Sequence, residues 1–143
     1  QSRGLGDVYK RQTQERAEQL KSVIHAVNDA VDVILCDEAE LAKRAPELTS
    51  IVNTTSVGMA PNVKASPLTK SVFHEGCLAF DLVYNPKQTK FLADAEKQGA
   101  KTVNGLQMLV AQAVYSVEIW MGGNIVAHVD MNALVRDLEK AIK

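Results

Sequence analysis

Three polar segments each follow an apolar run, and each carries side chains that could hold a ligand. Residues 53–59 (NTTSVGM) follow the apolar residues from Leu48 onward, and residues 81–86 (DLVYNP) end a run that starts at Cys77. Residues 104–112 (NGLQMLVAQ) follow the short run 101–103. Ligands of open parallel sheets bind beyond the carboxyl ends of the strands. If the apolar runs are strands, these three segments are the candidate site.

The first two segments offer hydroxyl groups at predicted strand ends. Thr54, Thr55 and Ser56, with the backbone amides of a tight turn, suit the phosphates or ribose of a nucleotide. An ordinary polar loop is an equally good interpretation of that composition. Asn85-Pro86 forces a turn that leaves Tyr84 at the sheet rim, where its phenol could donate a hydrogen bond to a substrate. A purely structural tyrosine is the alternative.

The third segment places three chemically distinct residues on one helix face. Gly105, Met108 and Gln112 lie at positions i, i+3 and i+7, which form one stripe of a helix. A glycine lets backbone approach a ligand closely, a flat ring could lie on Met108, and the amide of Gln112 could bind hydroxyls. The alternative is that Met108 fills the core and Gln112 is a satisfied buried amide.

The elements that must position these segments alternate along the chain. Phe91, Leu92 and Ala95 are expected to face inward on one of the helices. The predicted helices are 13–27, 37–45, 89–98, 106–121 and one opening near 130, and the predicted strands are 31–36, 48–53, 77–83 and 101–103. Strands that alternate with helices predict an α/β protein with a parallel sheet covered on both faces.

Composition argues against several other classes of protein. Sixteen Lys and Arg stand against seventeen Asp and Glu, a net charge of −1, so no bulk positive field would recruit nucleic acid or anionic lipid. No apolar run approaches the ~20 residues of a membrane span, and no signal peptide is expected. Cys36 and Cys77 predict buried free thiols in a reducing cytoplasm. The three scattered histidines give no metal-binding pattern, so no metal site is expected.

Four segments, in order and at compatible spacing, resemble the C-terminal part of shikimate dehydrogenase. They are residues 13–17 (TQERA), 53–59, 81–86 with Thr89, and 105–112. The resemblance runs from about Thr13 to Lys143. It implies a partial Rossmann-like domain in a cytoplasmic oxidoreductase. That enzyme family reduces 3-dehydroshikimate with NADPH, a step toward chorismate and the aromatic amino acids.

The resemblance also implies roles for individual residues. Thr13 and Arg16 fall in the segment that binds the 2′-phosphate of NADP. Leu82 and Gly105 would border the nicotinamide, with Met108 nearby. Tyr84 and Gln112 match positions that contact the small-molecule substrate, shikimate.

The chain departs from the family pattern in two ways. Gln12 stands where the family has an arginine that recognises the 2′-phosphate, which leaves open an NAD-using quinate/shikimate dehydrogenase. The family's substrate domain, with its catalytic lysine–aspartate pair, and the glycine-rich phosphate loop have no counterpart here. No catalytic residue is therefore assigned. A non-catalytic nucleotide-binding module and a different nucleotide-using enzyme with a doubly wound sheet are the rival interpretations.

The resemblance divides the chain into three expected parts. Residues 1–12 fit poorly with the rest and are expected to be a foreign or artefactual segment. Residues 13–109 would form the partial NADP-binding domain, and residues 110–143 the helices that return to the substrate domain. Without that partner, Val114, Val117, Trp120 and Met121 would be partly exposed. Self-association through these helices is the expected consequence.

Overall fold

A computed structural model describes residues 3–142, with side chains from Gln14 onward. The chain divides into two compact units, residues 1–40 and 41–143. The first unit contains one long helix, α1 (Arg3–Val27), whose apolar residues Leu20 and Val23 are exposed. The predicted helix 13–27 therefore exists and begins earlier. The side chains of residues 1–12, the expected foreign segment, lie outside those described.

The predicted strand 31–36 is wrong. These residues form no strand, and Val31, Ile34 and Leu35 are each at least 40% exposed. An apolar run becomes a strand only when a neighbour completes its ladder of hydrogen bonds, and no strand of the described sheet pairs with this segment. For the same reason Cys36 is exposed, contrary to the expectation of two buried thiols, whereas Cys77 is buried as expected.

The sheet of the described residues has three parallel strands in the order β1-β2-β3. They are β1 (Ser50–Asn53), β2 (Leu78–Asp81) and β3 (Lys101–Val103). In the register of β1 with β2, Asn53 lies opposite Asp81, so both strands end at the same level. The α/β class and the parallel sheet are confirmed, and β1 and β2 are shorter than the predicted strands 48–53 and 77–83.

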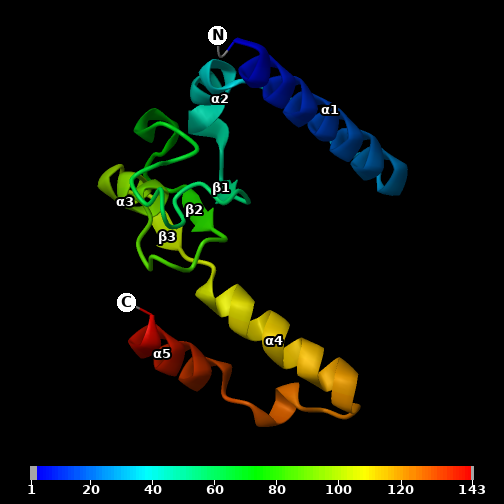
Figure 1. Ribbon diagram of the computed structural model, residues 1–143, viewed down its shortest axis with the longest axis vertical. Coiled ribbons are helices and arrows are strands. Elements are labelled where there is room, and N and C mark those ends of the chain that lie inside the picture. Colours follow the sequence, from blue (N-terminus) through cyan, green and yellow to red (C-terminus); the bar gives the residue numbers. More distant parts are fainter. Residues whose placement is uncertain (1–2, 143) are drawn as a thin grey trace. The chain divides into compact units, whose positions relative to one another are not determined.

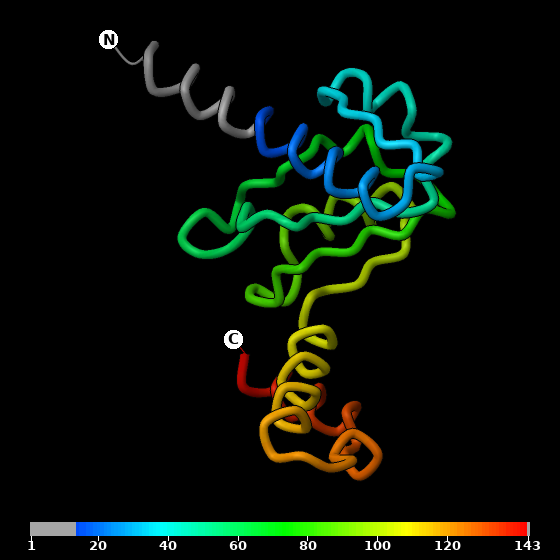
Figure 2. The backbone as a smooth tube through the Cα atoms, turned by 90° about the vertical axis from the view of Figure 1, so that its right-hand side faces the viewer, coloured from blue at the N-terminus to red at the C-terminus, as the bar shows by residue number. Residues whose placement is uncertain are grey.

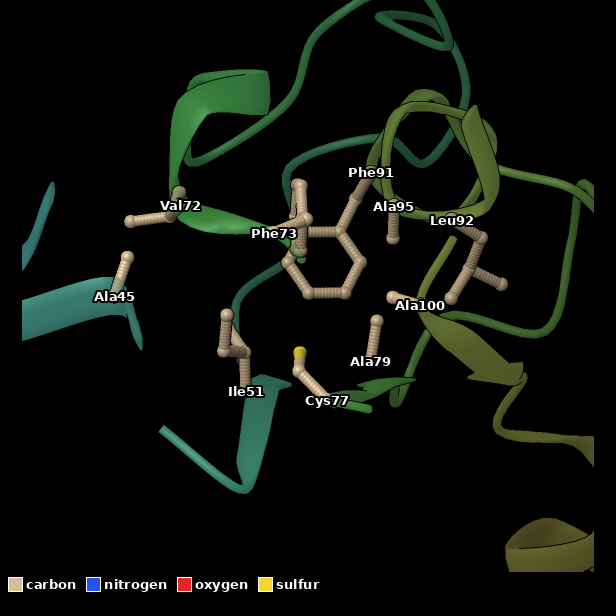
Figure 3. Packing of buried hydrophobic residues seen from close by; sticks show 10 residues of the cluster. All are labelled: Ala45, Ile51, Val72, Phe73, Cys77, Ala79, Phe91, Leu92, Ala95 and Ala100. Atoms are coloured by element: carbon tan, nitrogen blue, oxygen red, sulfur yellow. The ribbon is translucent and has the colours of Figure 1, made fainter. Parts of the chain in front are cut away.

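Helix α3 (Lys90–Lys97) connects β2 to β3 and covers the sheet. Its residues Phe91, Leu92 and Ala95 are buried, as the helical spacing predicts. Phe91 meets Phe73 edge-on, with ring centroids 5.1 Å apart and an interplanar angle of 82°, an arrangement that the ring quadrupoles favour. Figure 3 shows the rings and small side chains of this core, which comprises Ala45, Ile51, Val72, Phe73, Cys77, Ala79, Phe91, Leu92, Ala95 and Ala100.

Short helical segments close the rest of this core. Helix α2 (Glu38–Arg44) continues into the 3-10 turn η1 (Ala45–Glu47), where Pro46 ends the regular helix. A second turn, η2 (Lys70–Val72), brings Val72 into the core.

The chain ends in a pair of helices that pack against each other in opposite directions (Figures 1 and 2). They are α4 (Leu106–Met121) and α5 (Met131–Ala141), joined through the turn η3 (Val126–His128). Trp120 and Met121 are 81% and 73% exposed, as expected. Val114 is buried, contrary to expectation. It continues a stripe with Leu106 and Val110 at four-residue spacing, which forms the buried face of α4.

Among the described residues, no helix has the length and apolar character needed to cross a bilayer.

Candidate functional site

A pocket of about 340 Å³ lies beyond the carboxyl ends of β1 and β2. One wall is the loop that follows β1, and the other is the loop that follows β2. The lining residues are Thr54, Thr55, Ser56, Met59 and Ala60 from the first loop, and Leu82, Val83, Tyr84 and Asn85 from the second. The structure therefore brings together five predicted site residues, namely Thr54, Thr55, Ser56, Leu82 and Tyr84. The lining combines hydroxyl groups with apolar side chains, as small-molecule sites usually do.

The fully buried carboxyl group of Asp81 lies between the two loops. Its Oδ1 accepts a hydrogen bond from Asn53 Nδ2 at 2.9 Å and one from the backbone N–H of Val83 at 3.0 Å. Its Oδ2 accepts a 2.5 Å hydrogen bond from the hydroxyl group of Thr89. One carboxyl group thus holds three segments of the chain together.

Asn53, at the end of β1, shapes the first wall of the pocket. Its Oδ1 accepts hydrogen bonds from the backbone N–H of Thr55 at 3.0 Å and from the Thr55 hydroxyl group at 2.7 Å. Its Nδ2 also donates to the carbonyl oxygen of Val57 at 3.2 Å. These bonds fold residues 53–57 into a tight turn built by an asparagine side chain.

Thr89 links the site to helix α3. Its hydroxyl oxygen accepts a hydrogen bond from the backbone N–H of Leu92 at 3.3 Å, and so caps the helix. Its side chain also lies against Gly58, where an added Cβ would come 3.5 Å from the Thr89 Cβ. Thr89 therefore touches both the first loop and Asp81.

Gly105 makes a close approach, but the group it approaches is protein backbone. An added Cβ would lie 2.0 Å from the carbonyl oxygen of Leu82, and the Gly105 N–H donates to the Val83 carbonyl oxygen at 3.3 Å. The start of α4 is thereby fixed beside the second wall of the pocket. This contact explains the glycine without a ligand, and a role for Gly105 beside the nicotinamide stays a prediction.

Met108 and Gln112 do not line the pocket. Met108 is half-buried on α4 and Gln112 is exposed. The interpretation of Gln112 as a satisfied buried amide is therefore wrong. Its contact with a ligand shared with Tyr84 stays a prediction, as does the place of Met108 near a flat ring.

The two residues expected at the 2′-phosphate belong to the other unit of the chain. Arg16 is exposed on α1, and the Thr13 side chain lies outside those described. Both roles stay predictions. In the described part of the chain, no group of three or more His, Cys, Asp or Glu side chains could hold a metal ion.

Asn53, Asp81 and Thr89 belong to the sequence motifs described above, but no role is predicted for them from the sequence. Each is at most 3% exposed, so the three form a buried polar cluster. A polar residue that ends an apolar strand was the available signal, because a buried polar group must find a hydrogen-bond partner. The sequence does not show that these three are one another's partners.

Comparisons with known proteins identify relatives of this chain, although no family model matches it. The shikimate dehydrogenase (NADP(+)) of Caldicellulosiruptor saccharolyticus is 37% identical over an alignment 143 positions long, which covers 97% of this chain and 49% of that enzyme. The chain thus spans about half the length of this curated relative.

Two solved structures have a similar fold. Shikimate 5-dehydrogenase of Thermus thermophilus, in complex with NADP(H) and shikimate, is 35% identical with a TM-score of 0.55; the match covers 67% of this chain and 36% of that one. The enzyme of Listeria monocytogenes, in complex with shikimate and NAD, is 29% identical with a TM-score of 0.61, over 71% of this chain and 34% of that one. The chain is therefore a homologue of the shikimate dehydrogenases that corresponds to part of their length.

Proposed function

We propose that the pocket beyond β1 and β2 receives NADP and, beside it, shikimate, in an enzyme that reduces 3-dehydroshikimate. One observation carries this proposal: the hydroxyl groups of Thr54, Thr55 and Ser56 and the phenol of Tyr84 line one pocket at the ends of two parallel strands. The complex of the Thermus homologue with NADP(H) and shikimate supports both ligand classes.

The residues of the pocket suit binding and orientation. Hydroxyl groups and backbone N–H groups of the first loop bind the polar parts of a nucleotide. Leu82 offers an apolar side chain to a ring, and Tyr84, 38% exposed, presents a phenol that donates a hydrogen bond to a substrate oxygen. The cofactor of such a reaction supplies the hydride, and the protein supplies binding and orientation. The proton transfer is assigned to no residue of this chain.

NAD is the second candidate cofactor. Gln12 stands where the family carries an arginine for the 2′-phosphate, and the Listeria homologue was solved with NAD. A guanidinium bound to phosphate contributes roughly 1.5–3 kcal/mol through charge-assisted hydrogen bonds. A glutamine in place of this arginine reduces the preference for NADP over NAD.

The experiment is an absorbance assay at the nicotinamide band with the protein expressed from its complete gene. Shikimate and quinate are each offered with NADP and with NAD. Reduction of NADP by shikimate supports the proposal, and faster reduction of NAD supports the second candidate. Nucleotide binding by calorimetry without turnover of either substrate would instead identify a binding module.

We also infer the setting of this activity. Cys36 and Cys77 are both free thiols, which suits the reducing cytoplasm. Reduction of 3-dehydroshikimate would place the protein in the route to chorismate and aromatic amino acids. A second copy of the chain is the proposed partner of the exposed apolar end of α4, where Trp120 lies.

A further inference from the structure

We propose that Asp81 is a positioning residue that sets the two walls of the pocket relative to each other. Asp81 does not line the pocket, and it acts through its hydrogen bonds to Asn53, Val83 and Thr89. Its effect on ligand binding rests on the function proposed above. Its effect on the two loops does not.

Asp81 lies at the end of the sheet where the two walls of the pocket begin. Asp81 and Asn53 occupy the last paired position of β2 and β1, and the backbone N–H of Leu82 donates to the Asn53 carbonyl oxygen at 3.0 Å. Beyond this point the two strands give way to the loops that line the pocket. The side-chain bond from Asn53 to Asp81 is therefore a cross-link at the place where the walls diverge.

Asp81 also sets the direction of the Asn53 amide. Asn53 carries both a donor and an acceptor, whereas the Asp81 oxygens that face it accept hydrogen bonds. Asp81 thus requires the NH2 group of Asn53 to point toward β2. The carbonyl oxygen of Asn53 must then face Thr55, where it accepts two hydrogen bonds. One acceptor on β2 fixes the conformation of a loop that follows β1.

Asp81 is linked in addition to the second wall of the pocket and to α3. The same Oδ1 atom that holds Asn53 accepts from the backbone N–H of Val83, which lines the pocket. The Oδ2 atom holds Thr89, the cap of α3. Both walls and one supporting helix therefore meet at a single side chain.

The chemistry of a buried carboxyl group also favours a positioning role for Asp81. Asp81 is fully buried. If the position served only for packing, an apolar residue would suit it better, because burial of a polar group is unfavourable without hydrogen-bond partners. A buried hydrogen-bond network in which every polar group has a partner favours a single conformation of the segments it joins. In the described part of the chain, no buried side-chain nitrogen or oxygen lacks a partner.

The test uses three variants and one matched control in the protein expressed from its complete gene. Asp81→Asn keeps the shape of the side chain but replaces one acceptor oxygen of the network with an NH2 group, which donates. Thr89→Val removes the hydroxyl group with little change in shape, whereas Thr89→Ser keeps the hydroxyl group and loses only a methyl group. Asp130→Ala is the control, because Asp130 caps α5 by accepting from Ala133 N–H and lines no part of the pocket.

The first readout is amide hydrogen exchange without ligand, which reports on the loops whatever the protein binds. We expect the amides of Thr55 and Val83 to exchange about 10-fold faster in Asp81→Asn and several-fold faster in Thr89→Val. The first variant removes one acceptor oxygen from the network that holds both loops, and the second removes the hydroxyl group that donates to Asp81 Oδ2. Thr89→Ser and Asp130→Ala should match the unaltered protein at these two amides. Unchanged exchange at Thr55 and Val83 in Asp81→Asn would overturn the proposal. If that variant does not fold, the Thr89→Val and Thr89→Ser pair decides in the same way.

The second readout separates positioning from general stability. For folded Asp81→Asn we expect KM for NADP and shikimate to rise about 10-fold, with kcat falling less, because ligand contacts in both walls are displaced. A fall in kcat with unchanged KM would indicate only a smaller folded fraction and would overturn the proposal. If the unaltered protein turns over neither substrate, the proposed function fails, and the exchange readout still decides the role of Asp81.

Discussion

Asn53 and Asp81 end neighbouring parallel strands in register, and a 2.9 Å hydrogen bond joins their buried side chains. Strand ends in open α/β sheets are where ligands bind. The bond therefore lies behind the candidate site and connects its two walls.

Substitution of Gly105 by alanine should destabilise the protein by about 3 kcal/mol, at the upper end of overpacking effects. The added Cβ would lie 2.0 Å from the Leu82 carbonyl oxygen, which is a backbone atom and cannot rotate away as a flexible side chain would. Denaturant unfolding measures this loss.

The matched control for Gly105 is Gly122→Ala. Gly122 has no atom within 4 Å of its would-be Cβ, but its φ of +64° disfavours other residues. Gly122→Ala should destabilise the protein by about 1–2 kcal/mol, the cost of holding a non-glycine residue at positive φ. Equal losses for the two variants would show that the Leu82 contact relaxes.

Removal of the Tyr84 hydroxyl group should weaken substrate binding. Tyr84→Phe should raise KM for shikimate about 10-fold and leave KM for NADP nearly unchanged, since one hydrogen bond to substrate contributes roughly 1.5 kcal/mol. Steady-state kinetics of the complete gene product provides the measurement. Tyr115→Phe is the control, because Tyr115 is exposed on α4 and does not line the pocket. An unchanged KM for shikimate in Tyr84→Phe would remove the phenol from the site.

Gln112 tests whether α4 contributes to the same site. Gln112→Ala should raise KM for shikimate and barely alter that for NADP, because the amide is expected to bind substrate hydroxyl groups. Gln107→Ala, an exposed amide nearer the start of the same helix, is the control. Equal increases in both KM values would exclude a specific substrate contact for Gln112.

The apolar end of α4 should make this 143-residue chain self-associate. Ile119, Trp120 and Met121 are each more than 70% exposed, and contiguous apolar patches on proteins favour association. Light scattering should show species larger than a monomer, and Trp120→Gln should reduce them. Val27→Gln, which replaces a side chain that is 85% exposed in the other unit, should not. A monodisperse monomer would contradict this prediction.

The local elements followed from the sequence wherever their stabilising contacts are local. Helix 106–121 has the predicted bounds, and α3 differs by one residue at each end. Apolar spacing, a capping Thr89 and a terminal Gly122 act within one or two helical turns. The run 31–36 has the composition of a buried strand, but a strand also needs a neighbour, and neighbours are distant in sequence.

The sequence by itself determined the parallel α/β class, the hydroxyl-bearing loops and the relation to shikimate dehydrogenases, because periodicity and motif order are properties of contiguous residues. Only the tertiary structure decided that Asn53, Asp81 and Thr89 form one buried network and that Gly105 abuts the Leu82 backbone. Those contacts depend on strand register and helix placement. Both are fixed by packing between segments that lie far apart along the chain.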